Sequence, residues 1–140
     1  DMVKQANTSR RRLLFIFADM DGLKKINDEF GHEAGDQAIC FAAEALQEAF
    51  CEKELIIRYG GDEFLVVSDA LCREQAEEKK AQITALLKQW QRDEKLPYRL
   101  SMSIGYYQKE PDTEASMEQY INWADERMYE MKCKNREQRK

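Results

Sequence analysis

The sequence predicts an α+β domain in which a mostly antiparallel central sheet is flanked by helices. Strand-like and helix-like apolar patterns follow one another in the order β-α-α-β-β-α-β-α. Two adjacent strand patterns are joined by a pair of glycines, which indicates a hairpin and therefore antiparallel pairing. The length of 140 residues suits one domain, and the 43% apolar fraction is enough to form a folded core.

The first half of the chain contains one strand and two helices. Residues 13–18 form a continuous apolar run, which is typical of a strand buried on both faces. Residues 23–30 carry apolar side chains at spacings of three and four, and Gly31 ends this short helix. A second helix is expected from Gly35 to about residue 50, and its alanine-rich stripe predicts close packing on the sheet.

The second half of the chain begins with the hairpin, at residues 55–67. Gly60 and Gly61 predict a tight turn with positive φ angles, which glycine adopts without strain. An amphipathic helix is expected over residues 70–91, and alternation predicts a strand over residues 98–107. A final helix is expected over residues 114–136.

Composition and charge exclude several classes of function. The net charge of −5 and the pI near 5.1 argue against binding to polynucleotides or to anionic membranes. Four scattered cysteines without a CxxC pair, together with a single histidine, exclude the usual Cys/His zinc sites. No apolar run approaches the ~20 residues of a membrane span, and no signal peptide is visible. We therefore expect a cytoplasmic domain, with any membrane tether of the parent protein outside this chain.

Four carboxylates stand at the ends of predicted strands. Asp19 and Asp21 end the first strand, while Asp62 and Glu63 follow the glycine pair of the hairpin. If these strands are neighbours, up to four carboxylates converge and would repel one another unless a cation lies between them. Magnesium suits such a site, and two ions would clamp a phosphoryl group during in-line transfer. The alternative is that Asp19 or Asp21 caps the next helix and that the hairpin acids are solvated.

Two further groups of polar residues have both a functional and an ordinary interpretation. Asn27, His32 and Asp36 cluster around the joint between the two early helices, where they would read a purine edge or merely cap the helix ends. Lys132 and Arg136 are four residues apart on the last helix. They would neutralise a triphosphate or simply form a solvated basic end that favours the helix dipole.

Taken together, these residues resemble the GGDEF family, the catalytic domain of bacterial diguanylate cyclases. The hairpin carries the family's string unaltered at residues 60–64, preceded by an Arg-Tyr pair. Residues 19–36 are similar to the family's first motif, and residues 103–105 and 124–136 to its closing segments. The resemblance covers nearly the whole chain, so it implies a single GGDEF domain over residues 1–140. It also implies the palm-like fold of nucleotidyl cyclases, with a ferredoxin-like core.

The resemblance implies a reaction in which two GTP molecules form cyclic di-GMP and release two pyrophosphates. The 3′-hydroxyl of one nucleotide attacks the α-phosphate of the other. Since one domain binds one GTP, catalysis is expected to need a homodimer. One alternative is a catalytically silent GTP-binding module that regulates an attached domain. Another is a purely structural dimerisation domain, which would leave the polar residues described above without a role.

The resemblance also implies a role for each matching residue. Two Mg²⁺ or Mn²⁺ ions would be held by Asp19, the Met20 carbonyl, Asp62 and Glu63. Asp62 and Glu63 would also act in catalysis. The residues expected to contact guanine are Asn27 and Asp36, with His32 nearby. The residues expected to contact the phosphates are Gly22, Leu23, Lys24, Lys132 and Arg136.

The chain departs from the family pattern at three places. The family's opening helix is absent from residues 1–12, so we expect a fragment of a larger sensory protein with an upstream sensory or dimerising domain. The product-inhibition motif Arg-x-x-Asp falls at Cys51 and Glu54, so inhibition through that site is not expected. Asn135 stands where glycine is common. In contrast, Asp36 is retained, and this favours GTP over ATP.

Overall fold

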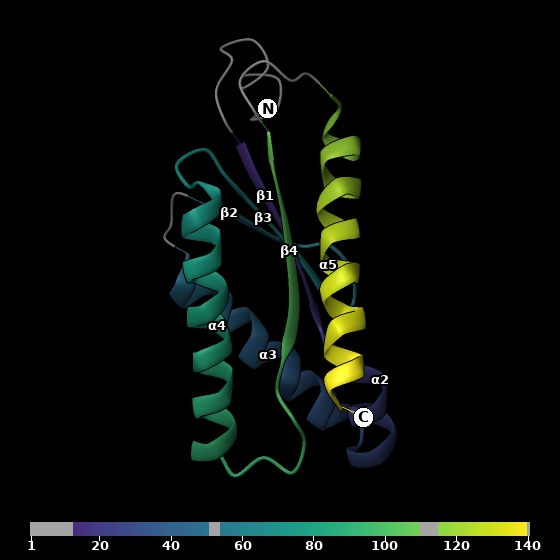
Figure 1. Ribbon diagram of the computed structural model, residues 1–140. Helices are drawn as coiled ribbons and strands as arrows, with labels where there is room; N and C mark the ends of the chain where they lie inside the picture. The colour runs from purple at the N-terminus through teal and green to yellow at the C-terminus, as the bar shows by residue number, and fades with distance from the viewer. Residues whose placement is uncertain (1–12, 51–53, 110–114, 140) are drawn as a thin grey trace.

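The computed structural model describes residues 13–50, 54–109 and 115–139, with side chains as far as residue 135 (Figure 1). These residues form four strands and four helices in the predicted order β-α-α-β-β-α-β-α. In chain order the elements are β1 (Leu13–Met20), α2 (Leu23–Phe30), α3 (His32–Ala49), β2 (Leu55–Arg58), β3 (Glu63–Ser68), α4 (Arg73–Asp93), β4 (Met102–Lys109) and α5 (Met117–Arg139).

The four strands form one sheet in the order β2-β3-β1-β4, and every neighbouring pair is antiparallel. The predicted antiparallel sheet is thereby confirmed. Strand β1 is central, and its residue Asp19 lies opposite Glu63 on β3 and Ser103 on β4. Residues directly opposite one another in an antiparallel sheet share a face. These three side chains therefore belong to the same face of the sheet.

Helices cover both faces of the sheet, as Figure 1 shows for α4 and α5. Even-numbered residues of β1, such as Ile16, pack in the cluster that includes α2, α3 and α4. Odd-numbered residues pack against α5, where the Phe15 ring stacks on Tyr120 at 5.0 Å between centroids. Because both faces of β1 are buried, its sequence is a continuous apolar run without alternation.

Helix α5 lies unusually close to β4 at Gly105. A Cβ atom on Gly105 would lie 2.0 Å from the backbone nitrogen of Met128 and 2.4 Å from the carbonyl carbon of Arg127. Any side chain at this position would therefore push α5 away from the sheet. The glycine therefore sets the distance between β4 and the middle of α5.

The predicted hairpin is confirmed, but its turn differs from the expected one. The connection comprises residues 59–62, and the described glycines with positive φ are Gly22 and Gly31, not Gly60 or Gly61. The backbone N–H groups of Tyr59 and Gly60 both donate to the Glu63 carbonyl, at 2.8 and 3.3 Å. The turn is therefore closed by hydrogen bonds around a four-residue loop, and left-handed glycines are not required.

Several element boundaries also differ from prediction by a few residues, and two of the differences have a clear cause. Helix α3 begins at His32 because Gly31, with a φ of 94°, already makes the break between the helices. Strand β4 begins at Met102, and not at residue 98, because its partner β1 ends opposite it at Met20. Residues 98–101 therefore have no β1 residue with which to pair.

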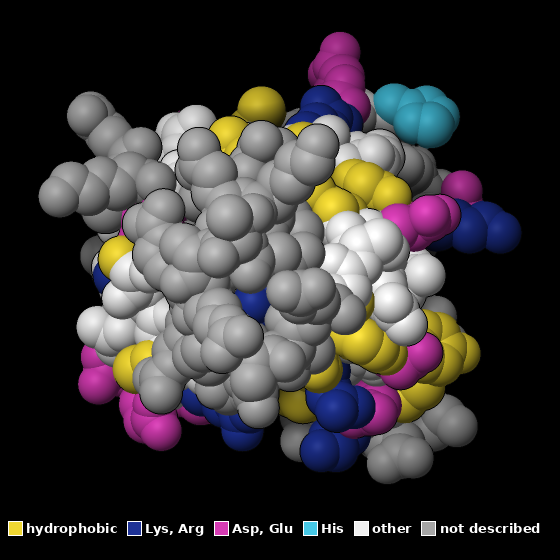
Figure 2. Space-filling model, turned by 90° about the horizontal axis from the view of Figure 1, so that it is seen from above, with side chains coloured by type: hydrophobic (Ala, Val, Ile, Leu, Met, Phe, Trp, Pro, Cys, Tyr) yellow, Lys and Arg dark blue, Asp and Glu magenta, His cyan; other side chains and the backbone are white. Residues whose placement is uncertain are grey.

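The surface mixes charges of both signs. On the face drawn in Figure 2, cationic and acidic side chains are interspersed around the rim without forming one large patch of either sign. None of the described helices combines the length and the apolar character that a membrane crossing would need.

Candidate functional site

Three acidic residues converge where β1 and β3 meet the hairpin loop. Asp19 lies near the end of β1, Asp62 ends the loop, and Glu63 begins β3. One carboxylate oxygen from each residue lies within 4.8 Å of the other two. The Met20 N–H donates to the Asp62 carbonyl at 3.2 Å and ties the loop to the strand end. The predicted convergence is confirmed for these three acids.

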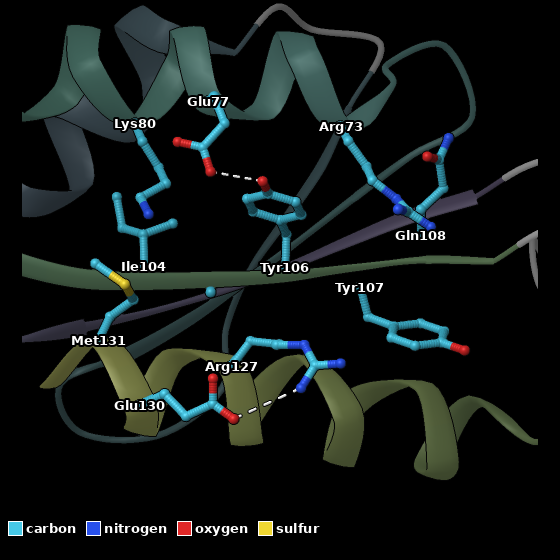
Figure 3. A pocket seen from close by; sticks show the side chains of 11 residues that line it. Arg73, Glu77, Lys80, Ile104, Tyr106, Tyr107, Gln108, Arg127, Glu130 and Met131 are labelled. Atoms are coloured by element: carbon cyan, nitrogen blue, oxygen red, sulfur yellow. Dashed lines mark hydrogen bonds and ion pairs between the residues drawn. The ribbon is translucent and has the colours of Figure 1, made fainter. Parts of the chain in front are cut away.

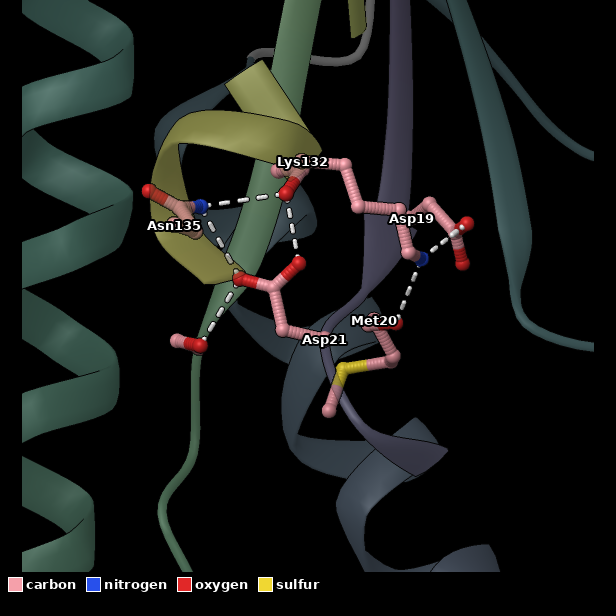
Figure 4. Close-up of polar contacts among 7 residues, drawn as sticks. Asp19, Met20, Asp21, Lys132 and Asn135 are labelled. Carbon is pink, nitrogen blue, oxygen red and sulfur yellow. Dashed lines mark hydrogen bonds and ion pairs between the residues drawn. The ribbon is translucent and has the colours of Figure 1, made fainter. Parts of the chain in front are cut away.

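Asp21 does not join this cluster, so three of the up to four acids that were predicted to converge do so. Its buried carboxylate accepts hydrogen bonds from Ser101 Oγ at 2.8 Å, Ser103 Oγ at 2.5 Å and Asn135 Nδ2 at 3.1 Å (Figure 4). The capping alternative is wrong, because the N-cap of α2 is Gly22 and no side chain caps it. The donors on β4 and α5 account for the burial of this carboxylate.

Lys132 reaches from α5 to the acid cluster. Its Nζ lies 2.6 Å from Asp19 Oδ2 and 3.3 Å from the Met20 carbonyl oxygen (Figure 4). Only 17% of the Lys132 side chain and 10% of the Asp19 side chain are exposed, so the pair is largely withdrawn from water. The ammonium thus contacts two of the oxygen atoms that were predicted to bind metal.

The acid cluster disfavours full ionisation. Burial raises the pKa of Asp19 to about 7, Lys132 opposes this rise, and the neighbouring Asp62 carboxylate adds to it. The pKa of Glu63 is also raised, first by burial and then by the negative charges of Asp62 and Asp125. Such shifts are expected where carboxylates crowd together with too little positive charge to balance them.

The residues of the cluster suit a divalent cation. Asp19 Oδ1 is buried and receives no hydrogen bond from the described residues. An unsatisfied carboxylate oxygen, two further carboxylates and the nearby Met20 carbonyl are all hard oxygen ligands. Mg²⁺ and Mn²⁺ prefer such ligands, and their charge would relieve the repulsion among the acids. The donor set therefore fits either ion.

Helix α2 begins directly beyond the acid cluster. Gly22 precedes it with a φ of 67°, a left-handed conformation that turns the chain sharply from β1 into the helix. The first intrahelical bond runs from the Ile26 N–H to the Gly22 carbonyl at 3.0 Å. The backbone N–H groups of Leu23 and Lys24 come before Ile26 in the helix, so they have no carbonyl acceptor within it. They form the kind of helix start that binds phosphate.

The structure brings Asn27, His32 and Asp36 to the joint between α2 and α3. Gly31 forms the joint and donates its N–H to the Asn27 carbonyl at 2.9 Å. The half-buried Asn27 side chain occupies the space beside Gly35, where a Cβ atom would lie 1.7 Å from Asn27 Oδ1. His32 and Asp36 are exposed in the first turns of α3. The three residues therefore lie at or next to the joint.

Two of the predicted positions lie partly or wholly outside the described residues. Arg136 belongs to the backbone of α5, one turn beyond Lys132, but its side chain is not among those described. Cys51, at the first position of the product-inhibition motif, also lies outside the described residues, whereas Glu54 precedes β2. The expectation for that motif thus stays a prediction.

A cavity of about 340 Å³ lies along the outer edge of β4, between α4 and α5 (Figure 3). Tyr106 projects from β4 into it and donates to Glu77 of α4 at 2.5 Å, and Arg127 of α5 forms its opposite side. None of the predicted site residues lines this cavity. It is separate from the acid cluster.

The comparisons with known proteins assign the chain to a family. Residues 1–138 match the family model described as "Diguanylate cyclase, GGDEF domain", so the chain belongs to the GGDEF family. It is 31% identical over 134 residues to MucR of Pseudomonas aeruginosa, a bifunctional diguanylate cyclase/cyclic di-GMP phosphodiesterase. It is 36% identical over 96 residues to the cyclic di-GMP phosphodiesterase PdeB of Shewanella oneidensis. These matches cover 96% and 68% of the chain but only 19% and 11% of the relatives.

Solved structures confirm the palm-like nucleotidyl-cyclase fold. The isolated GGDEF domain of TpbB from Pseudomonas aeruginosa aligns with a TM-score of 0.78 at 29% identity, covering 94% of this chain and 77% of that one. The active GGEEF domain of a diguanylate cyclase from Vibrio cholerae aligns with a TM-score of 0.74 at 26% identity, covering 91% and 80%. The likeness at 20% identity to DgcB of Caulobacter crescentus, solved with c-di-GMP, concerns the fold alone.

Sequence reasoning missed the residues that surround Asp21 and the acid that influences Glu63. Ser101, Ser103 and Asn135 contact Asp21, and Asp125 on α5 raises the pKa of Glu63. One signal was available, because Asn135 lies three residues after Lys132 and therefore on the same side of the helix.

Proposed function

We propose that this chain is the catalytic domain of a diguanylate cyclase and forms one domain of a larger sensory protein. Two GTP molecules are condensed into cyclic di-GMP, and two pyrophosphates are released. The observation that carries this proposal is the convergence of Asp19, Asp62 and Glu63 beneath the Lys132 ammonium. A purely structural domain would gain nothing from placing Asp62 where its charge raises the pKa of both Asp19 and Glu63.

The phosphates of GTP are held by groups on two helices. The N–H groups of Leu23 and Lys24 at the start of α2 donate to phosphate oxygens, and the left-handed turn at Gly22 directs them there. Lys132 and Arg136 neutralise the triphosphate from the last turns of α5. These groups orient the α-phosphate next to the acid cluster, and such positioning supplies much of the rate in phosphoryl transfer.

The chemical step joins the two nucleotides. Bound Mg²⁺ or Mn²⁺ at the acid cluster would supply charge neutralisation for the α-phosphate and the attacking oxygen. One of the two carboxylates, Asp62 or Glu63, takes up the single proton of the 3′-hydroxyl, and the raised pKa of Glu63 favours such a role. The O3′–Pα bond forms as the bond to pyrophosphate breaks, and repetition of this step in the opposite direction closes the ring. Two copies of the domain must therefore face each other, each with one GTP.

Guanine is recognised at the joint between α2 and α3. The Asn27 amide and the Asp36 carboxylate are suited to the donor and acceptor groups of its edge, and His32 lies at the same joint. Asp36→Ser removes the acceptor for the guanine N–H groups. Selectivity for GTP over ATP should fall in this variant, and an unchanged preference would refute the assigned role.

A second candidate function is a GTP-binding module that regulates an attached domain without turnover. One comparison favours it, because the relative PdeB is named only as a cyclic di-GMP phosphodiesterase, yet it matches 68% of this chain. The complete acid cluster favours the cyclase, since binding alone does not need every one of these carboxylates.

Product formation separates the two candidates. The chain is dimerised by fusion to a two-stranded coiled coil, incubated with GTP and Mg²⁺, and cyclic di-GMP is measured by chromatography. The cyclase should form product, and Asp62→Ala should abolish it. Glu126→Gln, which removes an exposed acid on α5, should retain activity. Tight GTP binding without product would favour the regulatory module, and neither binding nor product would leave only a structural role.

A further inference from the structure

Asp21 stands at the centre of a partly buried hydrogen-bond network that the proposed reaction does not use. This network consists of Asp21, Ser101, Ser103 and Asn135, and we refer to it as the Asp21 network. Asn135 Nδ2 lies 3.1 Å from Asp21 Oδ2 and 3.0 Å from Ser103 Oγ, so each of its two hydrogens has an acceptor. Ser103 Oγ donates in turn to Asp21 Oδ1. Because a carboxylate oxygen accepts hydrogen bonds, the amide nitrogen is the atom of Asn135 that faces it.

The Asp21 network joins α5 to the strand end that carries the acid cluster. Asn135 follows Lys132 by three residues, so both side chains leave the same side of the helix. Lys132 contacts Asp19 and Met20, while Asn135 contacts Asp21. Three consecutive residues at the end of β1 are therefore held by two polar side chains of α5 (Figure 4).

Beyond Met128, no described apolar side chain of α5 is fully buried. The buried apolar residues of the helix among those described are Tyr120, Ala124 and Met128, which pack over β1 and β4. Beyond Met128, the described side chains are half-buried or exposed. In these turns the half-buried Met131 adds partial packing, while Lys132 and Asn135 make polar contacts with the end of β1 and with Asp21.

We propose that Asn135 is a positioning residue for Lys132. By fixing the last turns of α5 on Asp21, it holds the Lys132 ammonium over Asp19 and the Met20 carbonyl. A lysine ammonium is carried on a flexible four-carbon stem, so its location depends on where the helix backbone is held. If the proposed function is correct, the same anchor sets where Lys132 meets the phosphates of GTP.

A simple stabilising role for the network makes a different prediction. Ser101 also donates to Asp21 Oδ2, but it lies next to β4 and does not belong to α5. Ser101→Ala removes a hydrogen bond from the same carboxylate and leaves the α5 anchor intact, so it is the matched control. A stabilising role predicts similar effects of Ser101→Ala and Asn135→Ala on Lys132, whereas a positioning role predicts an effect of Asn135→Ala alone.

The first test observes Lys132 directly in the full chain without nucleotide or metal. The side-chain signals of ¹⁵N,¹³C-labelled lysines are recorded by NMR, and the Lys132 signal is assigned by its loss in Lys132→Met. We expect Asn135→Ala to move this signal towards those of exposed lysines such as Lys134, and Ser101→Ala to leave it in place. An unmoved signal in Asn135→Ala, or an equal shift in both variants, would overturn the proposal.

The second test is a double-mutant cycle on the binding of Mg²⁺ and a GTP analogue that cannot react at the α-phosphate. Asn135→Ala should weaken binding by about 3- to 10-fold in the natural background and have no further effect when Lys132 is methionine. Equal weakening in both backgrounds would contradict action through Lys132. Thermal unfolding identifies variants that do not fold, and Asn135→Leu, which is close in shape, then replaces the alanine variant.

The two tests separate failure of this proposal from failure of the proposed function. If the natural chain does not bind the GTP analogue, the proposed function fails. The NMR comparison still decides whether Asn135 positions Lys132, because it requires neither nucleotide nor metal.

Discussion

Replacing Asp62 by asparagine should stabilise the metal-free protein and abolish its stabilisation by metal. The side chain of Asp62 lies with Asp19 and Glu63 in a cluster whose carboxylate oxygens are within 4.8 Å of one another. At that distance and an effective dielectric constant between about 20 and 80, each pair of charges repels by about 1–3 kcal/mol. Asparagine removes the charge of Asp62 and keeps its shape.

The expected effect on thermal unfolding follows from this repulsion. Relief of about 1–3 kcal/mol in a domain of this size raises the Tm by about 3–10 °C. The experiment is performed near pH 8.5, so that Asp19, with its pKa of about 7, is ionised. Addition of Mg²⁺ at about ten times its Kd should stabilise the natural protein by about 1.4 kcal/mol and the variant by almost nothing.

The control is Glu126→Gln, which also removes one negative charge but lies exposed on α5. It should change the Tm of the metal-free protein little and should leave the Mg²⁺ effect intact. The reasoning is refuted if Asp62→Asn does not raise the Tm in the absence of metal, or if the variant retains the full Mg²⁺ effect.

Three further predictions concern the same region. Because the pKa of Asp19 is raised in the folded state, the free energy of unfolding of the metal-free protein should fall as the pH rises from about 4 to about 7. Over the upper part of that range, the affinity for Mg²⁺ should rise by up to tenfold per pH unit, because the ion binds the deprotonated carboxylate. Calorimetric titrations that show no change with pH would contradict this prediction. Lys132 lowers the pKa of Asp19, so Lys132→Met should move the pH midpoint of Mg²⁺ binding above about pH 7. An unmoved midpoint would exclude the ion pair between Lys132 and Asp19. Gly105→Ala should lower the Tm by about 5–12 °C, because the added Cβ meets the backbone of α5. Gly61→Ala is the control and should change the Tm little, because a Cβ added there has no neighbouring atom within 4 Å. Equal effects of the two variants would argue against the close approach of α5 to Gly105.

Most of the fold could be predicted because its signals are local. The continuous apolar run of β1, the helical spacing of α2 and the break at Gly31 each depend on neighbouring residues alone. The turn of the hairpin could not be predicted in the same way. Its form depends on hydrogen bonds to Glu63 across the loop, and glycine permits both the predicted and the observed geometry.

The candidate site could be predicted in composition but not in detail. Strand pairing brings Asp19 opposite Glu63, and the family resemblance implied that both are metal ligands. The separate environment of Asp21 depends on β4 and α5, which are more than 79 residues away in sequence. The contact of Lys132 with Asp19 spans 113 residues and could not be deduced from helical spacing.

The central claim is that the acid cluster beneath Lys132 is a metal and triphosphate site. Anomalous diffraction from crystals grown with Mn²⁺ and a GTP analogue blocked at the α-phosphate tests this most directly. We predict a metal peak among Asp19, the Met20 carbonyl, Asp62 and Glu63, with the Lys132 ammonium moved from Asp19 to the phosphates. A nucleotide bound elsewhere, or a cluster without a metal peak and with Lys132 still on Asp19, would contradict the claim.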